Sequence, residues 1–478
     1  MKRLMPLLLI ILLVLPLCGC MSGETGGTTT AAPTTLPPTT TAAPTTAALT
    51  TTPAPTYPQN TISLYPNGYD DSAAIHDAIE MIPNGGTILF HPGTYYANIT
   101  IENTNKSFSL VSLEGKNTTI LDGQKKGSVI QVKDIDGYKG ISVITVQGFT
   151  IRNGSGTYNY YDGEYYYSSN VGGGIMNENS SLILSNCTLT ENAAYEGAGV
   201  YCKDSYIQIN NCFFENNIAA TIDNYGRVDE YGYGGGLILI ESDATISSCG
   251  FRYNEAGQGG GISNNDSKVT ILECSFYRNE GSGIMTAGHH DTHIVGCMFN
   301  DNVSWYGGGG ISNYGSAVLI ENCTFSNNSE RGEGGGAIIN WGATTIITNC
   351  KFSMNKAGIG GGVCNMEASN TTFNDCTFYR NTAEYGGGAV YDDGDIVWGP
   401  YPSAVTYVYS SCTFNKCIFK ENVAYDGDVY WEGGAIYYWK SCIGLNDCVF
   451  EGNLPDDLYE DPFVYLGNSW EEWEEWEE

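Results

Sequence analysis

The sequence predicts an all-β protein folded as a parallel β-helix with three strands in each coil. The main observation is a six-residue phrase, Cys-x-Phe/Leu-x-x-Asn, which occurs ten times, mostly at steps of 23 to 27 residues. A unit this short cannot bury an apolar face alone, so it must stack on its neighbours. The copies begin at Cys187, Cys212, Cys249, Cys274, Cys297, Cys323, Cys350, Cys376, Cys417 and Cys448.

Each repeat contains three strand candidates separated by bends. The first follows a Gly cluster such as Gly360-Gly-Gly-Val-Cys, the second carries Ile or Val three residues before the Cys, and the third begins at the Cys. Alternation directs the Cys and the Phe inward. The residue before the Cys is Asn, Asp or Gly in seven of the ten copies, which predicts a left-handed bend. The Asn that ends the phrase is expected to mark the next bend, where stacked amides can hydrogen-bond along the axis.

We expect the β-helix to span residues 59–453, with about three degenerate coils before the first copy of the phrase. A helix is predicted to begin at Asp70-Asp71-Ser72 and to stop at Asn84-Gly85-Gly86. Its Ile75, Ile79 and Ile82 share one side, so it can cover the first coil and hide a sheet edge. Residues 454–478 form an acidic tail rich in Trp and Glu, which we interpret as frayed rather than helical.

The first 20 residues have the form of an export signal, because Lys2 and Arg3 precede an apolar run that continues through Leu17. Leu17-Cys18-Gly19-Cys20 resembles the lipobox of bacterial and archaeal lipoproteins. That resemblance implies lipidation of Cys20; the alternative is plain secretion with cleavage nearby. Residues 21–58 are nearly all Thr, Ala and Pro, which is typical of an O-glycosylated stalk or an extended spacer.

Composition argues against a nucleic-acid partner, since 21 basic residues face 53 acidic ones. An acidic balance instead suits a soluble, extracellular surface protein. Several Asn-x-Ser/Thr sequons are candidate sites of a glycoprotein: Asn98, Asn105, Asn117, Asn265, Asn302 and Asn370.

The Gly-Gly-Ala-Ile and Phe-x-x-Asn phrases resemble the repeats of chlamydial polymorphic outer-membrane proteins and of archaeal adhesin-like surface proteins. Residues 73–123, with Pro92-Gly-Thr-Tyr95 and Ile120-Leu-Asp-Gly123, resemble the start of pectate-lyase-like β-helices. The resemblance implies a right-handed helix. It leaves activity open, because such folds include lyases, hydrolases, esterases and adhesins without catalysis.

The cysteines of the phrase are interpreted as buried, reduced thiols. Equivalent side chains on stacked coils point the same way rather than at each other, and a small apolar group suits an inward site beside Phe. Disulfides between coils and metal ligation are the alternatives.

Two Tyr-rich insertions, 154–171 and 218–233, lie between a phrase-ending Asn and the next Gly cluster, two coils apart. They should leave the same corner, where exposed rings beside carboxylates can stack on sugars. The alternative is ordinary ladder stacking that shields the sheet edge. The ligand-binding candidates are Tyr160, Tyr161, Tyr166, Tyr195, Tyr225, Asp229, Tyr231, Trp305 and Tyr306.

A His cluster offers metal-binding or acid–base candidates: His289, His290, Asp291 and His293. Alternation would place His289, Asp291 and His293 on one face. Only the Gly-His of the polygalacturonase Gly-His-Gly phrase is present, so catalytic roles are not carried over. A third insertion contains Asp392, Asp393 and Asp395, which could hold Ca²⁺ but match no complete calcium loop, so a solvated acidic loop is favoured.

The sequence therefore predicts a lipid-anchored, stalked surface β-helix that binds an extracellular glycan or another cell surface, with no required cofactor. A polysaccharide lyase or glycoside hydrolase on the same fold is the second hypothesis. A passive envelope component, which would bind no soluble ligand, is the third.

Overall fold

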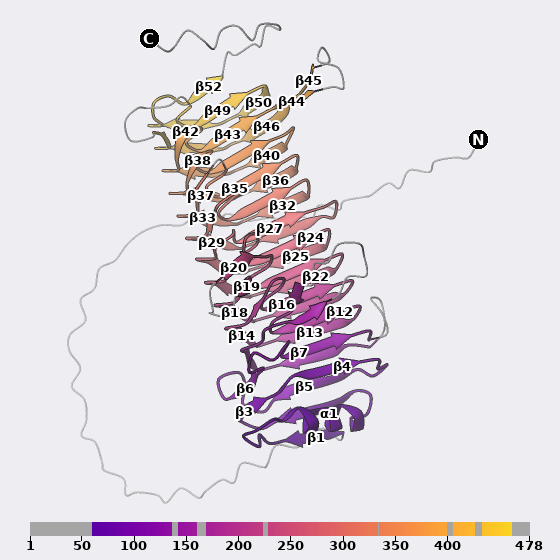
Figure 1. Cartoon of the computed structure of the whole chain (residues 1–478). Coiled ribbons are helices and arrows are strands. Elements are labelled where there is room, and N and C mark those ends of the chain that lie inside the picture. The colour runs from indigo at the N-terminus through magenta and orange to yellow at the C-terminus, as the bar shows by residue number, and fades with distance from the viewer. Residues whose placement is uncertain are drawn as a thin grey trace, which may run out of the picture. The chain divides into compact units, whose positions relative to one another are not determined.

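The computed structural model describes residues 60–135, 142–159, 169–222, 228–332, 334–398, 405–425 and 433–460. These residues form coils stacked along one axis, and α1 (Ser72–Met81) lies beside the first of them (Figure 1). Ile75 and Ala78 of α1, and Ile82 directly after it, are buried against the first coil, as the predicted capping helix requires.

Three long parallel sheets run the length of the stack, and the chain visits them in the same order in each coil. The first sheet has 14 strands: β1 (Thr61–Leu64), β2 (Gly86–Phe90), β5 (Phe108–Ser112), β8 (Ile144–Gln147), β13 (Ser181–Ser185), β17 (Tyr206–Asn210), β22 (Asp243–Ser247), β25 (Lys268–Leu272), β28 (Thr292–Val295), β32 (Ala317–Glu321), β36 (Thr344–Thr348), β40 (Asn370–Asn374), β46 (Ser410–Asn415) and β50 (Ser441–Asn446).

The second sheet contains the strands that follow the Cys of each phrase. Its 13 strands are β3 (Gly93–Tyr96), β6 (Thr119–Asp122), β9 (Thr150–Arg152), β14 (Thr188–Thr190), β18 (Phe213–Glu215), β23 (Gly250–Arg252), β26 (Ser275–Tyr277), β29 (Met298–Asn300), β33 (Thr324–Ser326), β37 (Lys351–Ser353), β41 (Thr377–Tyr379), β47 (Ile418–Lys420) and β51 (Val449–Glu451).

The third sheet contains the strands that follow the Gly clusters. Its 13 strands are β4 (Ile99–Glu102), β7 (Ile130–Lys133), β12 (Ile175–Glu178), β16 (Val200–Lys203), β21 (Leu237–Ile240), β24 (Ile262–Asn265), β27 (Ile284–Ala287), β31 (Ile311–Tyr314), β35 (Ile338–Trp341), β39 (Val363–Met366), β43 (Val390–Asp393), β49 (Ile436–Trp439) and β52 (Leu458–Glu460).

These sheets confirm the parallel β-helix and its repeat. Three coils, marked by β3, β6 and β9, precede the ten that carry the phrase, as predicted. The last strand continues to Glu460, beyond the expected boundary at 453, because β52 still pairs with β49 in parallel register. No Gly cluster precedes this strand, so the repeat pattern did not predict it.

The coils also contain a fourth strand that the sequence analysis did not predict. A five-stranded ladder lies at the turn between the second and third sheets, which we call the loop corner: β30 (Val303–Ser304), β34 (Ser329–Glu330), β38 (Lys356–Ile359), β42 (Thr382–Gly386) and β48 (Val423–Ala424). Pairings of one to three residues are too short to leave a period in the sequence.

The core is a file of Phe rings beside a file of thiols. Neighbouring rings of the phrase stack nearly parallel from Phe214 to Phe450, with centroids 4.6 to 5.0 Å apart. From Cys187 to Cys323, each Cys backbone N–H donates to the Sγ of the next coil's Cys at 3.3 to 3.5 Å. All 14 cysteines within the described part of the chain are free thiols, and 12 of them are buried.

The bend before each Cys is left-handed in all ten copies, with φ between 52° and 66°. The bend therefore persists at Ser248, Glu273 and Lys416, which lack the favoured side chains. The second bend falls one residue earlier than expected. The residue before each phrase-ending Asn, such as Arg278 or Asp301, has the positive φ, while the Asn itself points inward.

The phrase-ending asparagines form a continuous buried ladder. In each coil the side-chain amide donates to the Oδ1 of the next coil's Asn, as from Asn279 to Asn302 at 2.9 Å and from Asn302 to Asn328 at 3.0 Å. This ladder confirms the predicted amide stacking. It also corrects one predicted sequon, because the side chain of Asn302 is fully buried and cannot accept a glycan in the folded chain.

Candidate functional site

The two Tyr-rich insertions lie at the loop corner, as predicted. The first contributes the antiparallel strands β10 (Thr157–Asn159) and β11 (Ser169–Val171), and the second contributes β19 (Ile218–Ile222) and β20 (Val228–Tyr231). Val171 pairs with Glu196, and Glu196 pairs with Tyr233, in parallel bridges. The insertions are therefore two coils apart on one corner.

Tyr195 is held in place by the second insertion. Its hydroxyl donates to Glu230 Oε1 at 3.3 Å, and its ring meets that of Tyr233 edge-to-face with centroids 6.4 Å apart. Burial, followed by the nearby Glu230 carboxylate, raises the pKa of Tyr195 to about 12. The hydroxyl therefore stays a hydrogen-bond donor at every physiological pH.

Tyr231 makes an equivalent pair one coil further along. Its hydroxyl donates to Glu255 Oε1, and this hydrogen bond, followed by burial, raises the pKa of Tyr231 to about 12. The side chain is nevertheless 45 % exposed, so its hydroxyl is fixed while ring surface remains open to solvent.

Trp305 forms the most elaborate of these pairs. Its Nε1 donates to Glu280 Oε1 at 3.1 Å, and Arg331 Nη1 lies 3.6 Å from the same oxygen. The Arg331 guanidinium also lies over the Trp305 ring, 4.3 Å from the ring centroid. Next to it, Tyr306 is 84 % exposed. Trp305 is therefore held in place, with the exposed ring of Tyr306 beside it.

The carboxylates of the loop corner recur at one position of the coil. Glu255 pairs in parallel with Ile218 on one side and with Glu280 on the other, and Glu280 pairs with Val303. Glu230, Glu255 and Glu280 were not predicted from the sequence as partners of the rings. The signal for two of them was present, because Glu follows the phrase-ending Asn at Asn254-Glu255 and at Asn279-Glu280.

We call these side chains the aromatic edge. It consists of Tyr195, Tyr231, Tyr233, Trp305, Tyr306, Glu230, Glu255, Glu280 and Arg331. Asp229, also predicted, is exposed on β20 beside it. Tyr160, Tyr161, Tyr166 and Tyr225 lie outside the described residues, as does Cys20.

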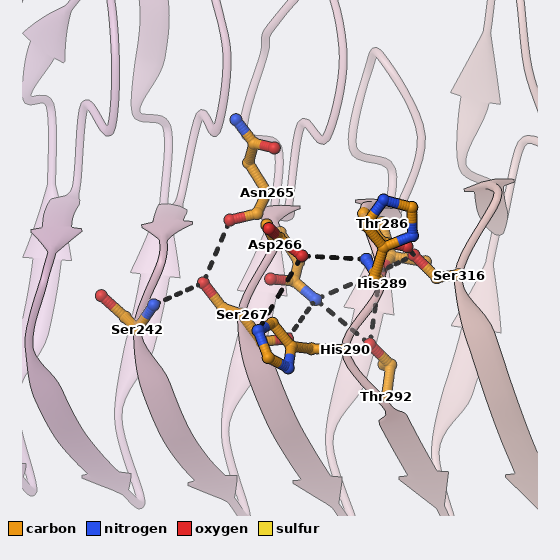
Figure 2. Close-up of polar contacts among 11 residues, drawn as sticks. Ser242, Asn265, Asp266, Ser267, Thr286, His289, His290, Thr292 and Ser316 are labelled. Atoms are coloured by element: carbon orange, nitrogen blue, oxygen red, sulfur yellow. Dashed lines mark hydrogen bonds and ion pairs between the residues drawn. The ribbon is translucent and has the colours of Figure 1, made fainter.

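The His cluster lies elsewhere, at the turn from the third sheet to the first. Figure 2 shows His289 and His290 around Asp266, which accepts the backbone N–H of His289 at 2.9 Å and lies 4.0 Å from His290 Nε2. Behind them, Thr286 and Thr292 belong to a buried polar column.

His293 and Asp291 lie on the outer face of the first sheet, apart from the other two histidines. They line an open cleft of about 390 Å³ together with Lys268, Leu319 and Ile346. The expectation that His289 lies on the same face as Asp291 and His293 is wrong. His289 lies in the turn before β28 and is not part of the cleft lining.

Asp392 and Asp393 of the acidic insertion do not converge on one site. Asp392 is fully buried inside the coil and accepts a hydrogen bond from Ser441 Oγ, while the alternation of β43 directs Asp393 to the opposite face. Asp395 begins β44 (Asp395–Trp398), which pairs with β45 (Val405–Val408). Throughout the described ranges, no three His, Cys, Asp or Glu side chains converge as metal ligands would.

In the described part of the chain, no helix combines the length and the apolar character that crossing a membrane requires. The anchor at Cys20 stays a sequence-based expectation, because this residue lies outside the described ranges.

Comparison with known proteins agrees with the architecture. Residues 219–346 and 302–456 match the family model of the right handed beta helix region. With the three parallel sheets, this match defines the chain as an all-β, right-handed parallel β-helix protein. No curated protein sequence matches it.

Several solved structures are similar to the chain at low identity. The catalytic domain of a GH87 α-1,3-glucanase in complex with tetrasaccharides has 11 % identity and a TM-score of 0.40, covering 82 % of this chain and 70 % of that one. The Streptococcus pneumoniae surface adhesin PfbA has 15 % identity and a TM-score of 0.35, covering 84 % and 99 %. The A-module of the Azotobacter vinelandii mannuronan C-5 epimerase AlgE4 has 13 % identity and a TM-score of 0.34, covering 82 % and 96 %. Similarity at this level assigns no activity.

Proposed function

We propose that this protein is a lipid-anchored surface β-helix that binds extracellular or cell-surface polysaccharide through its aromatic edge, in adhesion or polymer attachment. The observation that carries the proposal is the set of rings at one corner whose polar atoms are held by carboxylates while ring surface stays exposed. Such rings can stack on the C–H faces of sugars, and their fixed orientation limits the entropy lost on binding.

The rest of the chain supports a surface location. The lipobox-like Cys20 and the Thr/Pro-rich segment 21–58 would tether and space the β-helix away from a membrane. The negative net charge of −32 favours solubility at a crowded surface and disfavours polyuronate ligands.

A glycan array probed with the full chain tests this function. We expect a subset of glycans to bind and the signal to fall at least about tenfold in Trp305→Ala/Tyr306→Ala, as loss of stacked rings predicts. The matched control is Tyr69→Ala, which removes another exposed ring, 82 % accessible, beside the capping helix. Equal binding by both variants would contradict the proposal.

A carbohydrate-active enzyme is the second candidate, and the cleft on the first sheet is the observation that favours it. Asp291, His293 and Lys268 offer groups for proton transfer. The lining contains a single carboxylate, whereas glycoside hydrolysis generally requires two. Release of oligosaccharides from anionic polysaccharides, with or without Ca²⁺, and its loss in His293→Ala would favour this candidate instead.

A further inference from the structure

Arg331 shows how the aromatic edge holds a cation. Its guanidinium lies over the Trp305 ring at 4.3 Å from the centroid, and its Nη1 lies 3.6 Å from Glu280 Oε1. The ring supplies the face of a π-system, and the carboxylate supplies the countercharge. We use the word notch for an aromatic ring together with the carboxylate that bonds to its polar atom, an arrangement that can bind a positive group. The notch formed by Trp305 and Glu280 is occupied by Arg331.

Two further notches on the same edge have these components. In one, Tyr195 bonds to Glu230 and its ring meets that of Tyr233 edge-to-face, and in the other Tyr231 bonds to Glu255. Across the described ranges, neither Glu230 nor Glu255 has a Lys or Arg within 4.0 Å, in contrast to Glu280.

The two notches are joined through β20. Glu230 and Tyr231 are consecutive residues of that strand, and they bond to Tyr195 in the preceding coil and to Glu255 in the following one. Successive coils are about 4.8 Å apart along the axis, so a polymer running along the edge meets one notch after the other.

We propose that these two notches bind the ammonium groups of an amine-bearing polysaccharide, a polymer of amino sugars with unacetylated amines. This inference rests on the proposed function and specifies its ligand class. Each ionised carboxylate can accept several hydrogen bonds, and each bonded tyrosine occupies only part of that capacity. The ring faces add cation–π attraction, and two linked contacts bind with higher avidity than one.

The net charge of the chain also favours a cationic ligand. A value of −32 attracts cationic polymers at long range and repels uronate chains, and both effects weaken as salt shortens the screening length.

The test compares three probes of matched length on the full chain: an unacetylated glucosamine oligomer, its fully N-acetylated form and an oligogalacturonate. We expect the unacetylated oligomer to bind most tightly and to weaken as salt rises. Glu230→Gln/Glu255→Gln should raise its Kd about tenfold and the Kd of the acetylated form less than about twofold.

The matched control is Glu384→Gln. It removes a carboxylate of the same corner that already pairs with Lys356 at 3.2 Å, so it changes the net charge without emptying a notch. We expect less than about a twofold change in Kd, because an exposed ion pair contributes little. If Glu384→Gln weakened binding of the unacetylated oligomer as much as Glu230→Gln/Glu255→Gln does, the effect would be one of overall charge and the inference would be overturned.

The remaining outcomes separate the inference from the proposed function. If the acetylated oligomer or a neutral glycan binds as tightly as the amine, and Trp305→Ala/Tyr306→Ala abolishes that binding, then the ligand class is wrong and the function stands. If no glycan binds in a manner that depends on the aromatic edge, both are overturned.

Discussion

Replacing Asn302 with Ala should open the buried amide ladder at its centre. The Asn302 side chain donates through Nδ2 to Phe276 O and to Asn328 Oδ1, both at 3.0 Å. Its Oδ1 accepts the backbone N–H of Asn279 at 3.0 Å and the side-chain amide of Asn279 at 2.9 Å. The substitution removes all four hydrogen bonds.

The magnitude follows from burial. Each of the four bonds contributes about 1 kcal/mol net, which gives about 4 kcal/mol. The backbone N–H of Asn279 and the carbonyl of Phe276 then lose these partners in the interior, and an unsatisfied buried group costs about 1 to 3 kcal/mol. For the two groups this second estimate gives about 2 to 6 kcal/mol for the same loss. The two estimates agree on a fall in the free energy of unfolding of about 4 kcal/mol, a large part of the total stability of a typical domain.

Urea unfolding monitored by circular dichroism measures the change, and hydrogen exchange locates it. Amides of the coils around β29 should exchange faster, because each coil of a repeat protein depends on its neighbours. The control is Asn265→Ala, which removes an exposed amide from the outer face of β24 and should change stability by less than about 0.5 kcal/mol. A loss below about 1.5 kcal/mol for Asn302→Ala would refute the structural role of the ladder.

Three further predictions concern the interior. Burial raises the pKa of Asp392 from 3.8 to about 6, so the folded state binds the proton more tightly and wild-type stability should fall by about 2 kcal/mol as pH rises from 4 to 7. Asp392→Asn should lack this fall in pH-dependent urea titrations; an identical pH profile would contradict the assignment. Phe299→Ala should cost about 3 to 5 kcal/mol in the same assay, since the ring stacks between two neighbours at 4.7 Å on each side; a loss under about 1 kcal/mol would argue against the stack. A thiol reagent should label exposed Cys442 first in the native state and, after denaturation without reductant, at least the 14 free thiols; few free thiols would instead indicate disulfides.

The fold was predictable because the Cys-x-Phe/Leu-x-x-Asn phrase occurs ten times, and each copy indicates the same strand and the same bends. Each inward Cys and Phe, and each bend before the Cys, follows from alternation and from the backbone preferences of Asn, Asp and Gly. Ser248, Glu273 and Lys416 adopt the same bend against their own preference, since strands on both sides are already paired. Tertiary context there exceeds a local cost of about 1 to 2 kcal/mol.

The candidate site was only partly predictable. The positions of Tyr195, Tyr231 and Trp305 at one corner follow from counting coils. The partner of Tyr195 does not, because Glu230 reaches Tyr195 only through the antiparallel pairing of β19 with β20. Side-chain pairing across an inserted hairpin depends on its register, which no periodicity in the sequence encodes.

The central claim is that the polysaccharide binds at the loop corner. Hydrogen exchange of the full chain, with and without the tightest-binding oligosaccharide from the array, tests it most directly. We predict slower exchange in 193–196, in 228–233 and in 303–306, which carry the aromatic edge. Protection confined to β25, β28, β32 and β36, the strands that line the cleft on the first sheet, would contradict the account.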